Sequence, residues 1–178
     1  LYRSSDSGST WTQIYTGNPA NPISTLSATS TTLFAGSDNQ ILRSMNNGDT
    51  WEIITIPSNP SAVYSIYARS EMVLASTAFD GIYKSTDNGT TWTQSNTGLT
   101  TKLVWTIVSN GQAIFAGTVT GVFSSTDEGT TWHAFGLKGN YITALHATPT
   151  AVYAGLQGSS GLINASVWRA LLQPTSVS

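Results

Sequence analysis

An eight-residue pattern recurs four times along the 178-residue chain, and no other feature limits its fold as strongly. Each copy has a serine, an aspartate or asparagine two residues later, a glycine two residues after that, and a closing threonine–tryptophan pair. The closing tryptophans are Trp11, Trp51, Trp92 and Trp132, spaced by 40, 41 and 40 residues. A fixed period of this length indicates a repeat architecture with one structural unit per repeat.

The segments between the copies also repeat, and they read as short strands. They are rich in β-branched and aromatic residues and are bounded by Gly, Pro, Asn or Ser, which is typical of strands and turns. First strands are expected at 23–28, 63–68, 104–109 and 142–147, second strands at 33–36, 73–76, 114–117 and 152–155, and third strands at 41–43, 82–84 and 122–124. A fourth strand begins at each closing tryptophan. Four strands per 40 residues predict an all-β chain, a β-propeller built of four-stranded antiparallel blades.

The repeated pattern suits a hairpin turn between the third and fourth strands. An Asp or Asn side chain can accept backbone N–H bonds two residues on, and the glycine can take a positive φ without steric cost. Asn46 replaces the aspartate in the second copy and cannot act as a general acid. We therefore interpret the pattern as structural, with its tryptophans in the core. The residues assigned this role are Asp6, Gly8, Trp11, Asn46, Gly48, Trp51, Asp87, Gly89, Trp92, Asp127, Gly129 and Trp132.

The pattern S-x-D-x-G-x-T-W resembles the Asp box of the bacterial neuraminidase (BNR) repeat family. That family includes sialidases, β-glucan and xyloglucan hydrolases, sortilin-type receptors and photosystem II assembly factors. The resemblance covers essentially the whole chain and implies a propeller with the boxes on the blade rims, but leaves the function open. The ending 167–172 resembles the last repeat of secreted bacterial BNR proteins, which implies a secreted or cell-surface bacterial protein.

The predicted repeats divide the chain unevenly. We expect a partial blade at 1–16, blades at 23–56, 62–96 and 103–136, a final partial blade at 141–172, and a tail at 173–178. An unclosed ring would expose strand edges and blade faces. The prediction is therefore a partial ring or the C-terminal part of a larger propeller, completed by further blades or by a second chain.

Composition excludes several classes of function. The net charge of −2 and the 9% of charged residues argue against a nucleic-acid binder, which needs a basic face. The chain has no cysteine and only two histidines, His133 and His146, so no metal site is predicted, and no cofactor motif is present. No apolar run approaches the roughly 20 residues that span a bilayer, so membrane insertion is not expected.

Catalytic candidates are few. One repeat position carries a basic residue in most repeats: Arg3, Arg43, Lys84 and Arg169, with Ser124 as the exception. We expect the stems of these side chains to pack along the blade and their charged heads to lie in water. Sialidases use three clustered arginines, and only Arg69 lies off this position, so no sialidase pocket is predicted.

A glycoside hydrolase needs two carboxylates about 5–10 Å apart. Asp38 and Asp80, in equivalent loops, form the one candidate pair, and solvated turn aspartates are the alternative interpretation.

A binding function has more support than catalysis. The candidate binding surface is the face of the propeller opposite the boxes, which is formed by loops. Its loops differ between repeats, and Tyr64 and Trp105 open two innermost strands where other repeats have small residues, although burial in the core is the alternative for both. Aromatic faces beside amides suit sugars or a protein hot spot. The candidate ligand-binding residues are Phe79, Asp80, Lys102, Trp105, Asn140, Tyr141 and Gln157.

The leading hypothesis is a non-catalytic extracellular binding or scaffold module that recognises a glycan or a protein. The alternatives are a glycoside hydrolase with part of its site in other blades, and an assembly factor that docks on a membrane complex.

Overall fold

The computed structural model describes residues 1–18, 21–38, 40–57, 62–157 and 166–172. The predicted tail at 173–178 lies outside the described residues, as do positions 58–61 between two predicted blades and positions 158–165 of the predicted final partial blade. The described chain is all-β and forms five antiparallel sheets.

Each sheet is a meander in which strands pair in sequence order. The first sheet holds β1 (Tyr2–Arg3) and β2 (Thr12–Gln13); the second, β3 (Thr25–Ala28), β4 (Leu33–Gly36), β5 (Ile41–Ser44) and β6 (Glu52–Ile54). The third holds β7 (Val63–Arg69), β8 (Met72–Thr77), β9 (Gly81–Ser85) and β10 (Thr93–Gln94); the fourth, β11 (Val104–Ser109), β12 (Ile114–Thr118), β13 (Gly121–Ser125) and β14 (His133–Gly136). The last holds β15 (Tyr141–Thr148), β16 (Ala151–Gln157) and β17 (Ser166–Leu171). The predicted all-β fold of four-stranded antiparallel blades is confirmed.

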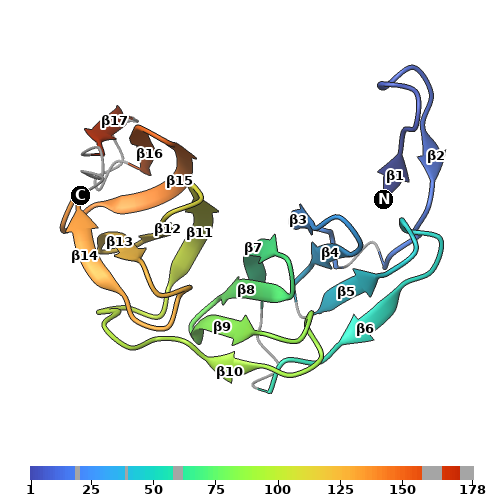
Figure 1. The fold of residues 1–178 in the computed structure, drawn as a ribbon, viewed down its shortest axis with the longest axis horizontal. Helices are drawn as coiled ribbons and strands as arrows, with labels where there is room; N and C mark the ends of the chain where they lie inside the picture. Colours follow the sequence, from blue (N-terminus) through green and yellow to red (C-terminus); the bar gives the residue numbers. More distant parts are fainter. Residues whose placement is uncertain (19–20, 39, 58–61, 158–165, 173–178) are drawn as a thin grey trace, which may run out of the picture.

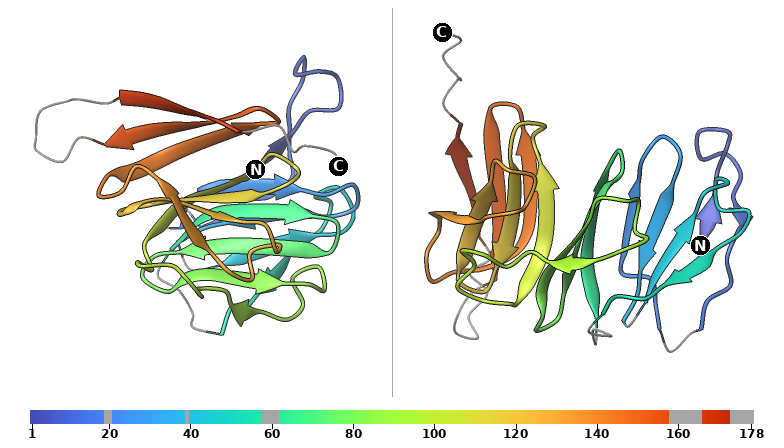
Figure 2. Two further views of the ribbon diagram at one scale, coloured as in Figure 1. Left: turned by 60° about the vertical axis from the view of Figure 1, so that its left-hand side comes forward. Right: turned by 60° about the horizontal axis from the view of Figure 1, so that its bottom comes forward.

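The five sheets stand side by side in an open arc (Figure 1), and their strands run nearly parallel to one another across the arc (Figure 2). The strands β3, β7, β11 and β15 lie on the inner side of the arc, and β6, β10 and β14 lie on the outer side. Hydroxyl groups join successive inner strands: Ile66 N donates to Thr25 Oγ1 at 3.2 Å, and Ile107 N donates to Ser65 Oγ at 3.1 Å. The arrangement is a partial β-propeller, as expected.

Three apolar clusters fill the spaces between neighbouring sheets. Phe34 and Trp92 belong to the first cluster, Leu74 and Trp132 to the second, and Phe115 and Ile142 to the third. Because the blades between the two ends of the arc bury both faces against their neighbours, the core is distributed along the arc, as in other repeat proteins.

The prediction of four core tryptophans holds for only part of the chain. Trp92 and Trp132 are buried, Trp132 with 1% exposure, but Trp51 is half-buried and Trp11 is 63% exposed. A box tryptophan packs against the sheet that precedes it. Trp11 is exposed because no sheet precedes β1 and β2 in this chain, and Trp51 because the first sheet has only two strands.

The two ends of the strands form two rims of the arc, and each rim carries its own set of turns. The turns after each second strand and the connections between sheets meet on one rim, where Val63 N donates to Ser37 O at 3.0 Å and Gly81 N donates to Lys102 O at 2.9 Å. We call this rim the loop face. The four boxes meet the turns after each first strand on the opposite rim, where Asn88 Nδ2 donates to Thr32 Oγ1 at 2.9 Å.

Candidate functional site

Each box aspartate is tied into its own turn. Asp87 Oδ1 accepts hydrogen bonds from Ser85 Oγ at 2.7 Å and Thr91 N at 2.8 Å, and Oδ2 accepts one from Thr91 Oγ1 at 2.6 Å. Hydrogen bonds to the charged carboxylate favour ionisation. The threonine hydroxyl, the threonine N–H and the serine hydroxyl thus lower the pKa of Asp87 and of Asp6 to about 2, and the pKa of Asp127 falls in the same way.

Asn46 makes the same turn without a charge. Its Oδ1 accepts from Ser44 Oγ at 3.0 Å and from Thr50 N at 2.9 Å, and its Nδ2 donates to Thr50 Oγ1 at 2.9 Å. An amide thus replaces every bond of the aspartate. The arrangement agrees with a structural role for all four boxes.

The box backbone also ties neighbouring sheets together, a feature that sequence reasoning missed. The residue before each box glycine has a φ of 58° in all four copies. Arg3 Nη1 donates to Asn47 O at 2.6 Å, Arg43 Nη1 donates to Asn88 O, and Lys84 Nζ donates to Thr130 Oγ1 at 3.2 Å. The prediction that these cationic heads lie in water holds only in part: the Arg3 side chain is 40% exposed and the Arg43 side chain 12%, and each cation contacts the box of the next sheet.

This contact accounts for the interruption at Ser124. Ser124 lies on β13, and the sheet that follows it, β15–β17, carries no box. No box is therefore available to a cation at this position. The repeat position is occupied by a cation wherever a box follows, so the basic residues belong to the scaffold rather than to an acidic-ligand site.

Two aromatic residues, Tyr64 and Trp105, form a pair at the loop-face end of two adjacent inner strands. The rings of Tyr64 and Trp105 are stacked, with centroids 4.5 Å apart and planes at 23°. Both residues interrupt the pairing register of their strand, so each is the extra residue of a β-bulge. Bulges re-aim side chains and are enriched beside active sites. Both side chains are half-buried, so neither is a fully buried core residue.

The other predicted ligand-binding residues fall into two groups on the loop face. Phe79 and Lys102 are exposed beside the half-buried Asp80, and the backbone bond between Gly81 and Lys102 joins their loops. Tyr141, at the start of β15, is 48% exposed and lies opposite Gln157 on β16. All of these positions lie on the loop face.

Asn140 is engaged in its own turn. Its Nδ2 donates to Leu137 O at 3.2 Å and to Lys138 O at 3.3 Å. The backbone carbonyl of Asp80 also has a structural role, since it accepts from Asn96 Nδ2 at 2.9 Å. Binding at this face would therefore depend on the aromatic residues, Lys102 and Gln157 more than on Asn140.

The acidic and imidazole candidates do not form a cluster in the described part of the chain. Asp38 is exposed and Asp80 half-buried, in equivalent loops of successive sheets. His133 and His146 are exposed on different sheets, and His146 lies 6.4 Å from Tyr153, measured between ring centroids. Within the described ranges, no group of three His, Cys, Asp or Glu residues could hold a metal ion.

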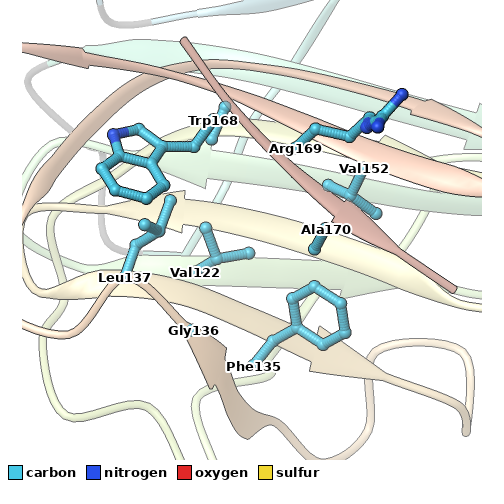
Figure 3. A pocket seen from close by; sticks show the side chains of 9 residues that line it. Val122, Phe135, Gly136, Leu137, Val152, Trp168, Arg169 and Ala170 are labelled. Atoms are coloured by element: carbon cyan, nitrogen blue, oxygen red, sulfur yellow. The ribbon is translucent and has the colours of Figure 1, made fainter. Parts of the chain in front are cut away.

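Two apolar hollows lie between neighbouring sheets near the two ends of the arc. One, of about 170 Å³, separates the fourth and fifth sheets and is lined by Phe135, Val152, Trp168 and Ala170 (Figure 3). The other, of about 410 Å³, is lined by residues of the first two sheets, including Leu26 and Leu33. Both lie beside an incomplete blade, the last with three strands and the first with two. None of the predicted ligand-binding residues lines either hollow.

No helix in the described part of the chain is long and apolar enough to cross a membrane.

Comparison with known proteins gives similarity in structure only: no family model and no curated protein sequence matches the chain. An ancestral GH74 enzyme matches with a TM-score of 0.72 and 20% identity, over 96% of this chain and 27% of that one. The extracellular domain of a one component system from B. thetaiotaomicron matches with a TM-score of 0.62 and 19% identity, over 83% and 22%. YCF48 bound to a D1 peptide matches with a TM-score of 0.65 and 16% identity, over 86% and 54%.

The chain thus spans less than a third of the first two proteins and about half of the third. At these identities the similarity establishes the fold and not the activity. The chain is a run of β-propeller blades that corresponds to a part of larger propellers.

Proposed function

We propose that the chain is a non-catalytic, extracellular binding module of the Asp-box (BNR) type, and that its loop face recognises a glycan. The observation that carries this proposal is the stacked pair of Tyr64 and Trp105 on two adjacent inner strands. The corresponding residues of the other two blades are Ser24, just before β3, and Thr143 on β15, so the aromatic pair is not part of the repeat scaffold.

The chemistry of the pair fits a neutral sugar. A half-exposed aromatic ring offers an apolar face, and polar groups around it can bond the hydroxyls of a sugar ring. Lys102 and Gln157 supply such groups on the same rim, which also carries the exposed rings of Tyr141 and Phe79. Because the loop face carries few charges, it suits an uncharged polysaccharide better than an acidic one.

A protein segment is the second candidate ligand. It is favoured by the similarity to YCF48, a propeller that was solved with a D1 peptide. The same aromatic surface would then act as a hot spot for an extended peptide, and the module would be an assembly or scaffold factor.

Hydrolysis is the third candidate. It would use Asp38 and Asp80, with the rest of the site in blades beyond this chain, as the similarity to a GH74 enzyme allows. It predicts that Asp38→Asn and Asp80→Asn abolish the release of reducing sugar while the fold stays intact.

A binding screen separates the three candidates. Purified protein is applied to arrays of neutral and acidic glycans and of extended peptides, and glycans that bind are then assayed for cleavage. We expect dose-dependent binding to one class of neutral glycan, without cleavage and with loss of the signal in Trp105→Leu. Binding to peptides alone would replace the glycan proposal with the scaffold candidate, and cleavage would replace it with the hydrolase.

A further inference from the structure

One of the three cations that reach a neighbouring box lacks the carboxylate that the other two have. Arg3 pairs with Asp49 of the next box at 2.9 Å, and Arg43 pairs with Glu52 of its own sheet at 2.6 Å. In the part of the chain that the structure describes, no ion pair involves Lys84. All three cations belong to the scaffold, but the chain leaves the charge of Lys84 without a counter-ion.

Threonines stand where a carboxylate could reach Lys84. Thr93 lies opposite Lys84 in the pairing of β10 with β9, as Glu52 lies opposite Arg43 in the pairing of β6 with β5. The next box offers Thr130, whose Oγ1 accepts a hydrogen bond from Lys84 Nζ at 3.2 Å. An ammonium group has three donors, so two N–H groups of Lys84 remain for another acceptor.

A polar hollow of about 380 Å³ lies at this position. Its lining includes Lys84, Thr86, Thr93, Gln94, Thr97 and Thr130, and Lys84 is the one charged residue among the described residues that line it. The hollow lies where the third sheet meets the box of the fourth, beside the outer strand β10 (Figure 1). Both of these sheets have four strands, so the hollow does not arise from an incomplete blade at either end of the chain.

The segment after β10 fixes one wall of the hollow to the fourth sheet. Ser95 Oγ donates to Gly129 O, and Trp132 Nε1 donates to Ser95 O at 2.9 Å. Trp132 N donates to Thr97 O at 2.9 Å. Ser95 and Trp132 are buried, so these bonds are shielded from water. The wall is therefore formed before a ligand arrives, which reduces the entropic cost of binding.

The carboxylates of the two adjoining boxes do not line the hollow. Asp87 and Asp127 each accept hydrogen bonds from the serine and the threonine of their own turn. The hydroxyl groups of Thr86 and Thr97, by contrast, make no hydrogen bond within the described residues. The hollow thus offers one cation and free hydroxyl groups, a combination that suits an anion which itself carries hydroxyl groups.

We propose that this hollow, which we call the Lys84 site, binds a hexuronate. The carboxylate of the sugar acid occupies the place beside Lys84 that Glu52 has beside Arg43, and the ring hydroxyls bond to Thr86 and Thr97. The volume lies in the range of small-ligand sites, roughly 300–1,000 Å³. A bare inorganic anion would leave the hydroxyl lining unused. The aromatic pair lies on the inner strands, so this site does not rest on the function proposed for the loop face.

Binding is measured by titrating the 178-residue protein with sodium glucuronate and following the chemical shifts of its backbone amides. Glucose has the same ring without the carboxylate, and acetate has the carboxylate without the ring, so they are the comparison ligands. We expect saturable binding of glucuronate, with shifts concentrated at Lys84, Thr93 and Thr130. Glucose and acetate should bind this site at least about tenfold more weakly.

Two variants test the site from opposite directions. Thr93→Glu supplies a carboxylate from within the chain, as Glu52 does for Arg43. It should abolish glucuronate binding without lowering the melting temperature, because the new ion pair closes the site. Lys84→Met removes the cation and should weaken binding at least about tenfold. Lys138→Met is the matched control, since Lys138 is an exposed lysine that does not line the hollow.

A glucuronate trimer distinguishes two sources of the ligand. Tighter binding of the trimer than of the monomer would identify a unit of an acidic polysaccharide, and equal or weaker binding a free sugar acid; either result supports the site. The proposal is overturned if glucuronate does not bind or if glucose binds equally well at the same amides. It is also overturned if Lys84→Met and Thr93→Glu bind glucuronate as the wild-type protein does.

Discussion

Arg43 on β5 donates a hydrogen bond to the carbonyl oxygen of Asn88, which belongs to the box of the next sheet. The same guanidinium contacts Glu52 on its own sheet at 2.6 Å and Thr90 at 3.2 Å. One side chain therefore joins two blades at the rim, where the apolar clusters between sheets end. Arg3 repeats the bond to the carbonyl at the preceding junction, and Lys84 reaches the next box through the Thr130 hydroxyl instead.

Loss of this contact should weaken the fold. We expect Arg43→Met to lower the free energy of unfolding by about 1–3 kcal/mol, the usual effect of removing hydrogen bonds to a charged group. Arg69→Met is the control, because Arg69 is exposed and reaches only Gly111 O, at 3.5 Å; it should change stability by less than about 0.5 kcal/mol. Urea denaturation measures both, and equal effects would contradict the inter-blade role of Arg43.

The box tryptophans should contribute differently to the free energy of unfolding, although their motifs are alike. Trp132→Ala removes a buried indole whose Nε1 donates to Ser95 O at 2.9 Å, and should cost about 3–5 kcal/mol. Trp11→Ala removes an exposed indole and should cost less than about 1 kcal/mol in the monomer. Thermal unfolding at low protein concentration compares the two. A large loss in Trp11→Ala would mean that Trp11 is packed in the isolated chain.

The repeat predicts the blades well because every strand and turn is encoded locally. The spacing of Trp51, Trp92 and Trp132 is enough to place four strands in each period. The environment of Trp11 could not be deduced from its motif, because burial depends on whether another sheet precedes it.

The candidate site was predictable only in part. The sequence separates Tyr64 and Trp105 from the repeat, but their stacking depends on bulges in two strands that are about 40 residues apart. The partners of Arg3 and Arg43 were missed because the carbonyl that each contacts belongs to a non-glycine residue with a positive φ in the next box. A motif of side chains does not reveal that geometry.

Glycines with similar backbone angles should respond differently to alanine. Gly98 has a φ of +89°, and a Cβ there would lie 2.0 Å from the carbonyl oxygen of Trp132. Gly111 has a φ of +91°, but a Cβ there would meet nothing within 4 Å. We expect Gly98→Ala to destabilise by more than about 3 kcal/mol and Gly111→Ala by about 1 kcal/mol. Urea midpoints that match in the two variants would show that Trp132 O can move away.

The boxes should make stability depend on pH in acid. The pKa of Asp6 and of Asp87 is about 2 in the folded chain, against a usual 3.8. A depressed folded pKa contributes stability that is complete above the unfolded value and is lost as pH falls through the folded value. The melting temperature should therefore fall between pH 4 and pH 2. Asn46→Asp should steepen this fall, because it adds a fourth titrating box, and an unchanged slope would contradict the role of the carboxylates.

Isothermal titration with soluble xyloglucan, mannan and xylan tests the proposed function most directly, with Trp105→Leu and Trp168→Leu as matched variants. Leucine keeps apolar bulk at each site, and Trp168 is an exposed tryptophan on β17, away from the aromatic pair. We predict that the wild-type protein and Trp168→Leu bind one of these glycans equally, and that Trp105→Leu loses at least about tenfold in affinity. Undiminished binding by Trp105→Leu, or no binding of any glycan by the wild-type protein, would contradict the account.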